Sequence, residues 1–235
     1  MKHKIITFGE LMLRLSPDNN ERFTQAHSYE AVYGGGEANT AVSLANFNVD
    51  TRYVTKLPKH TIGQSAVNSL RQYGVDVSRI VRGGDQIGIY FLEKKTSQRP
   101  TNVIYNRNGS AFALAAKEDF DWDSIFDGAT WFHFSGITPA ISDNMAEITI
   151  EACKEAKKRG ITVSCDLNYR SKLWSSEKAN KVMSEVCRYV DICIANEDDA
   201  VGIFGMDASK SDKEKNAYIA EELTKMFPNF KMVAS

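Results

Sequence analysis

Three consecutive glycines, Gly34–Gly36, stand directly before a helix-like segment that carries Glu37 and Asn39. Glycine allows close approach to the main chain and helix N-termini present free N–H groups, so the run predicts a site for a small polar ligand. The alternative is a plain turn without a ligand. Phosphate motifs do not fit: the chain has no G-x-x-x-x-G-K-[ST] sequence, and Asn39 occupies the third glycine position of the dinucleotide pattern G-x-G-x-x-G.

Tyr105 and Arg107 lie two residues apart in the strand-like segment 101–107, so their side chains share one face. A guanidinium beside a phenol suits a carboxylated ligand, because arginine pairs with a carboxylate through two hydrogen bonds. Tyr90 joins them if the segment 87–93 pairs with 101–107. The alternative is a solvated arginine and an edge-strand tyrosine.

Further polar residues follow two core strands. Arg170 and Asn168 come after the strand-like run 161–166, and Asn196 and Asp199 come after the run 191–195. In open α/β sheets, ligands gather where the carboxyl ends of parallel strands meet. The plainer alternatives are an Asx turn in the first loop and a helix N-cap in the second.

The elements that position these residues are strands and helices in alternation. They predict an α/β fold, a mostly parallel sheet with helices on both faces. The expected strands are 4–8, 52–56, 131–135, 161–166, 191–195 and 230–234, and the expected helices are 37–47, 65–73, 143–159, 177–189, 198–204 and 213–226.

Two inserts, 11–33 and 87–107, read as β-strands without helices, and 87–93 and 101–107 read as an antiparallel pair. We expect the inserts to form one small projecting sheet, a β lid. The remaining segments, 1–10, 34–86 and 108–235, form the α/β core.

The amino-acid composition limits which classes of binding partner and which cellular compartment are expected. The 235 residues carry a net charge of −1, with 43% hydrophobic and 25% charged residues. The sequence contains no long basic block of the kind that would indicate nucleic-acid binding. It also contains no apolar run of the roughly 18 residues that a membrane span needs. Four cysteines without a C-x-x-C pair indicate buried thiols in a cytoplasmic protein rather than a metal or disulfide site. His133, in an aromatic strand, reads as a core histidine rather than a catalytic base.

Several motifs in sequence order resemble the ribokinase-like, PfkB-type carbohydrate kinase family. They are FGE (8–10), GGGEANTAVSLA (34–45), TKLPKHTIGQSAVNSLRQYGVD (55–76), IYNRNGSAFALA (104–115), FSGI (134–137), DLNYRSKLW (166–174) and ANEDDA (195–200). Within that family, TKLP, YNR-x-x-SA and DLNYR-x-x-LW are most similar to 2-keto-3-deoxygluconate kinases.

The resemblance implies a ribokinase-like core and ATP-dependent phosphorylation of a small sugar acid with Mg²⁺. A fructokinase or other neutral-sugar kinase, or a sugar-binding fragment without catalysis, remain alternatives. The implied acceptor residues are Gly34, Gly35, Asn39, Tyr90, Tyr105, Arg107, Ile137 and Arg170. Asn168, Asn196 and Asp199 are implied for the phosphate and Mg²⁺ region, with no direct metal ligand and Asp199 acting through water. The lid implies a homodimer.

Departures from the family pattern are also present. Asn48 stands where the family has Gly or Ser, Pro58 where it has Gly, and Asp199 where the N-x-x-E motif has Glu. The G-A-G-D-like signature, with its aspartate base, is not in the sequence. We therefore expect an incomplete core whose catalytic base falls beyond Ser235, and negligible phosphoryl transfer by this chain alone.

Overall fold

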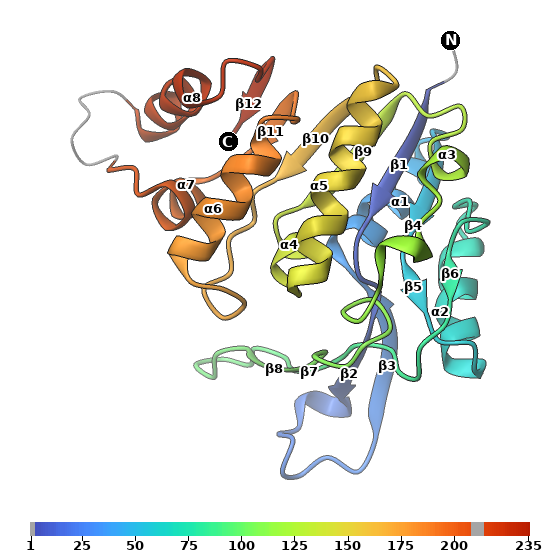
Figure 1. Ribbon diagram of the computed structural model, residues 1–235. Helices are drawn as coiled ribbons and strands as arrows, with labels where there is room; N and C mark the ends of the chain where they lie inside the picture. Colours follow the sequence, from blue (N-terminus) through green and yellow to red (C-terminus); the bar gives the residue numbers. More distant parts are fainter. Residues whose placement is uncertain (1–2, 208–213) are drawn as a thin grey trace.

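The computed structural model describes residues 3–207 and 214–235 and is built on a parallel six-stranded sheet (Figure 1). Its strand order is β12-β11-β10-β9-β1-β4, and every neighbouring pair runs parallel. The strands are β1 (Lys4–Phe8), β4 (Asp50–Val54), β9 (Trp131–Ser135), β10 (Thr162–Asp166), β11 (Ile192–Ile194) and β12 (Met232–Ala234). The predicted α/β class is confirmed.

Helices cover both faces of this sheet (Figure 1). Adjacent residues of β4 show why: Tyr53 packs into one hydrophobic cluster with α1 and α2, whereas Val54 packs into the other, with α5 and α6. The helices are α1 (Gly36–Asn46), α2 (Thr61–Arg71), α3 (Trp122–Ile125), α4 (Ile137–Ala140), α5 (Asp143–Lys158), α6 (Ser176–Cys187), α7 (Glu197–Phe204) and α8 (Lys215–Met226).

A second, four-stranded sheet projects from the end of the central one (Figure 1). It contains β2 (Met12–Pro17), β3 (Tyr29–Gly34), β7 (Ile89–Glu93) and β8 (Asn102–Asn106), in the order β3-β2-β7-β8. The predicted antiparallel pairing of β7 with β8 is confirmed, and β2 joins the two inserts by running parallel to β7. We call this sheet the lid. The division of the chain into core and lid units stays a prediction.

Short elements and boundaries differ from the sequence-based expectations. The predicted strand 52–56 ends at Val54, and a separate β5 (Lys56–Leu57) pairs with β6 (Val81–Arg82). α2 begins at Thr61, four residues early, because His60 Nδ1 accepts a hydrogen bond from Gly63 N at 3.4 Å and caps the helix. α3 and α4 were not predicted, since four residues are too few for a periodic pattern.

Other expectations at element ends hold. α5 has Ser142 as its N-cap, whose Oγ accepts from Met145 N at 3.2 Å, and Gly160 follows it with φ of +68°. Asn48 adopts the left-handed φ of +59° that its amide side chain tolerates. The predicted helix 213–226 begins at Lys215, and position 213 lies outside the described residues.

The core consists of two hydrophobic clusters, one beneath the helices of each face. All four cysteines are buried and free, as predicted, and burial raises the pKa of the Cys193 thiol to about 12. His133 is partly buried on β9: its Nδ1 lies 2.9 Å from Ser164 Oγ, and burial lowers its pKa to about 4. Of the helices in the described ranges, none combines the length and apolar character needed to cross a bilayer.

Candidate functional site

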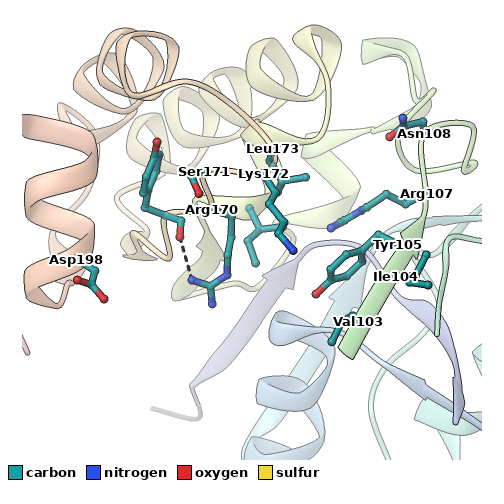
Figure 2. A pocket seen from close by; sticks show the side chains of 12 residues that line it. Val103, Ile104, Tyr105, Arg107, Asn108, Arg170, Ser171, Lys172, Leu173 and Asp198 are labelled. Carbon is teal, nitrogen blue, oxygen red and sulfur yellow. Dashed lines mark hydrogen bonds between the residues drawn. The ribbon is translucent and has the colours of Figure 1, made fainter. Parts of the chain in front are cut away.

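A cavity of about 700 Å³ opens between the lid strand β8 and the loop that follows β10 (Figure 2). Strand β8 and the residues directly after it supply one wall, the loop 169–173 supplies the other, and Ile137 lies between them. The lining residues are Val103, Ile104, Tyr105, Arg107, Asn108, Ile137, Tyr169, Arg170, Ser171, Lys172, Leu173 and Asp198. Sequence segments more than sixty positions apart thus meet around one space.

Arg107 enters this cavity from a buried ion pair. Its Nε donates to Glu10 Oε2 at 2.8 Å and its Nη2 contacts the same oxygen, while Ser110 Oγ donates to Glu10 Oε1 at 2.5 Å. Arg107 is 7% exposed and Glu10 5%. Burial raises the pKa of Glu10, and the Arg107 guanidinium opposes that rise. Glu10 lies between β1 of the core and β2 of the lid, so the pair fixes the guanidinium at the junction of lid and core.

Arg170 reaches the cavity from the opposite wall and is exposed. Its Nη1 donates to the neighbouring carbonyl oxygen of Tyr169 at 2.9 Å, the bond drawn in Figure 2. The preceding Asn168 adopts a left-handed φ of +40°, which turns the chain sharply after β10. The two arginines singled out from the sequence therefore line the same cavity from opposite sides.

Gly34, Asn39 and Tyr90 lie together beside the cavity rather than in its lining. A Cβ at Gly34 would stand 3.8 Å from both Asn39 Oδ1 and the Tyr90 hydroxyl. The Tyr90 ring stacks on Tyr105, which lines the cavity, with centroids 5.8 Å apart. Asn39 is exposed, and its side chain has no hydrogen-bond partner among the described residues. The cluster places the Asn39 amide and the Tyr90 phenol close to Tyr105, beside the cavity that the two arginines line.

Gly35 has a packing reason to be glycine. A Cβ there would stand 2.2 Å from the carbonyl oxygen of Glu10, so any side chain would displace backbone. Gly36, the next residue, has no such neighbour within 4 Å. A main-chain contact from Gly35 to a ligand stays a prediction.

Glu37 is a buried carboxylate that sequence reasoning left without a role. Its Oε1 accepts from Ser135 N at 2.9 Å and from Thr138 Oγ1 at 3.4 Å, and burial raises its pKa. A Cβ at Gly9 would stand 2.2 Å from Glu37 Oε2. Glu37 therefore ties the start of α1 to the carboxyl ends of β1 and β9. The one sequence feature that could have indicated this role is the position of an acidic residue directly after three glycines.

Asn196 and Asp199 form a capping box at the start of α7. Asn196 Oδ1 accepts from Asp199 N at 2.9 Å, and Asp199 Oδ2 accepts from Asn196 N at 3.1 Å. Asp199 Oδ1 also accepts from Tyr169 N at 2.6 Å, and the residue is only 2% exposed. Asp199 thus holds the loop that presents Arg170.

Comparison with known proteins identifies the family. The model for pfkB family carbohydrate kinases matches residues 2–229. The chain belongs to the PfkB family of carbohydrate kinases. Residues 3–207 and 214–235 of this PfkB chain supply no group of three or more His, Cys, Asp or Glu side chains arranged to hold a metal ion.

Individual relatives of this PfkB chain carry names of sugar-acid kinases. A crystal structure named 2-dehydro-3-deoxygluconokinase, from Thermotoga maritima, shares 49% identity with a TM-score of 0.95 and covers 99% of this chain and 70% of its own. The 2-dehydro-3-deoxygalactonokinase of Haloferax volcanii is 37% identical over 209 residues, which are 88% of this chain and 65% of that protein. For the 2-dehydro-3-deoxygluconokinase of Bacillus subtilis, the identity is 28% over 75% of this chain and 55% of that protein.

The chain therefore spans less than two thirds of the length of these two curated relatives. Of the charged residues in the cavity lining, two were not singled out from the sequence, Lys172 and Asp198. Lys172 follows Arg170 by two positions in the same loop, and this proximity was the one sequence feature that could have drawn attention to it.

Proposed function

We propose that this chain forms the acceptor site of a sugar-acid kinase, which transfers the γ-phosphoryl group of ATP to 2-keto-3-deoxygluconate and yields the 6-phosphate and ADP. The observation that supports it is the convergence of Arg107 and Arg170 on one cavity beside Gly34, Asn39 and Tyr90. Two guanidinium groups suit a carboxylate, because charge-assisted hydrogen bonds to it are stronger than neutral ones.

In this proposal each wall has a separate task. The arginines bind the carboxylate end, Tyr90, Tyr105 and the Asn39 amide hydrogen-bond the hydroxyls, and Ile137 packs against the carbon chain. Gly34 leaves the space between Asn39 and Tyr90 open for a hydroxyl. Such a clamp orients the acceptor and excludes water, which otherwise competes for the phosphoryl group.

ATP is the phosphoryl donor in this proposal, and Mg²⁺ neutralises the phosphate charge. Asn168 and Asn196 are proposed to face that region. Asp199 has both carboxylate oxygens engaged by backbone N–H groups, so we assign it the task of holding loop 169–170. Its water-mediated contact to Mg²⁺ stays a prediction, and no step is assigned through the metal.

Calorimetric titration of the chain with a panel of acceptors tests this function. We expect 2-keto-3-deoxygluconate to bind at least about 10-fold more tightly than fructose, which is a difference of about 1.4 kcal/mol. The galactonate epimer belongs in the panel, because the Haloferax volcanii relative carries that name. Equal or tighter binding of fructose would reject the sugar-acid assignment in favour of a neutral-sugar kinase.

We also propose a homodimer formed through the lid. An apolar row crosses the lid in register, with Ile104 opposite Phe91, Phe91 beside Leu15, and Leu15 opposite Ala31. Leu15 packs partly against the core and Phe91 against Phe23, so the row is most exposed at Ile104. Ile104 is 51% exposed. Exposed apolar sheet faces are unfavourable in a monomer. Sedimentation velocity checks it: a dimer is expected for the chain and a monomer for Ile104→Glu.

The buried free thiols support a reducing compartment, and we propose a cytoplasmic protein on that ground.

A further inference from the structure

The charges around the cavity do not all remain available to a ligand. Arg107 faces the buried carboxylate of Glu10, so that pair carries no net charge while Glu10 is ionised. Arg170 shares the lining with the exposed acid Asp198. Lys172 lines the same space and has no ion pair within residues 3–207 and 214–235. Arg170 has no ion pair in those ranges either, so two lining cations, Arg170 and Lys172, stand against one lining acid, Asp198, and the cavity carries a net positive charge of one. Lys172 is one of the two cations that supply it.

The geometry of Arg107 leads to the same residue. Glu10 accepts from Nε and lies against Nη2, so the side-on fork of the guanidinium is already occupied. A ligand carboxylate meets only the remaining N–H groups at the end of Arg107 and needs a further donor. Figure 2 shows the Lys172 amine directed toward Arg107 and Tyr105. An ammonium on a flexible stem fits this place, because its three donors can adjust to the carboxylate.

We propose that Lys172 is the specificity-determining residue that selects an acidic acceptor, by pairing its amine with the carboxylate that Arg107 grips end-on. This inference rests on the proposed function. A carboxylate and a phosphate ester share the chemistry that an amine binds, and the charges favour the carboxylate. The cavity offers one uncompensated positive charge, which matches a sugar acid of charge −1 better than a phosphate of about −1.5 to −2.

The test compares Lys172→Met and Lys172→Arg with the parent chain. Lys181→Met is the matched control, since Lys181 is an exposed lysine on α6 outside the cavity lining. Calorimetry is run with 2-keto-3-deoxygluconate, fructose and fructose 6-phosphate. We expect Lys172→Met to weaken binding of the acid about 10- to 100-fold, as for a charge-assisted contact, and to change fructose less than 2-fold. Lys172→Arg should restore most of the affinity, and Lys181→Met should change nothing.

The outcomes separate this inference from the function beneath it. If the parent chain binds the acid and Lys172→Met binds it equally well, only the role of Lys172 is wrong. If the parent chain does not bind the acid, the proposed function fails and the inference fails with it. An equal loss for fructose would make Lys172 a general contact and overturn its role in selection. Preferred binding of fructose 6-phosphate that disappears in Lys172→Met would overturn the assignment to a carboxylate. Denaturation midpoints confirm that the variants are folded.

Discussion

Arg107, directly after the lid's edge strand β8, and Glu10, two residues after β1, form a buried ion pair between residues 97 positions apart. The carboxylate also accepts from Ser110, so both of its oxygens are engaged. The contact joins the point where the chain leaves the core to the point where it returns from the lid. The same guanidinium lines the cavity.

Replacing Glu10 by Gln should destabilise the protein strongly, because it leaves the Arg107 charge buried without a counter-ion. We expect a loss of about 3–5 kcal/mol in the free energy of unfolding. The control is Glu30→Gln, whose partner Lys94 lies at 3.1 Å with both side chains nearly half exposed, and which should cost less than about 1 kcal/mol. Urea denaturation measures both, and equal midpoints for the two variants would contradict a structural role for the pair.

The neighbouring glycines offer a matched pair of substitutions. Gly35→Ala places a Cβ 2.2 Å from the Glu10 carbonyl oxygen and should cost about 1–3 kcal/mol through overpacking. Gly36→Ala meets nothing within 4 Å and should be neutral or stabilise by up to about 1 kcal/mol, because alanine favours the helix. Thermal unfolding distinguishes them. A similar melting temperature for both variants would show that the backbone at Glu10 yields easily.

His133 makes stability fall as the pH is lowered. Its pKa in the folded protein is about 4 because of burial, against 6.5 normally, so between these values the unfolded chain binds more protons than the folded one. We expect a loss approaching about 3 kcal/mol as the pH falls from 6.5 to 4. In His133→Gln this part of the acid dependence should disappear, whereas in His27→Gln, which removes an exposed histidine, it should stay. Identical pH profiles for all three proteins would refute the prediction.

Arg170→Ala should separate binding from stability. Arg170 is exposed, and its guanidinium donates a hydrogen bond to the carbonyl of its own neighbour, so the free energy of unfolding should change by less than about 0.5 kcal/mol. Under the proposed function, affinity for the sugar acid should fall about 10- to 100-fold. Paired denaturation and calorimetry check this. Unchanged affinity would remove Arg170 from the acceptor site.

The alternation of strands and helices was enough to predict the parallel sheet, because apolar runs and helical periodicity are local features. The same alternation predicted that Arg170 lies at the edge where the parallel strands have their carboxyl ends, since the loop after each parallel strand emerges at that edge. The two-residue period of β8 placed Tyr105 and Arg107 on one face, and the stacking of Tyr90 on Tyr105 follows from the pairing of β7 with β8. These parts of the site depend on topology alone.

The rest depends on contacts between distant residues, which no local pattern encodes. Nothing near Glu10 indicates that its partner is Arg107, and nothing near Gly35 indicates the Glu10 carbonyl against it. For Asp199 the plainer alternative of a helix cap is what the structure shows, but its contact to Tyr169 N comes from another loop. Lys172 was missed because a lysine in a polar loop is normally solvated, and only the assembled cavity gives it a place.

The two walls of the cavity are attached to different sheets, because Tyr105 lies on β8 of the small sheet and Arg170 lies in the loop that follows β10 of the large one. Any tilt of the small sheet relative to the large one therefore changes the distance between groups that hold the same molecule. Binding of a ligand in the cavity and the tilt of the small sheet are then linked thermodynamically, and the linkage is reciprocal. A substitution on β3, the edge strand opposite β8, which supplies no lining residue, will alter affinity by the same factor with which the bound molecule alters the tilt.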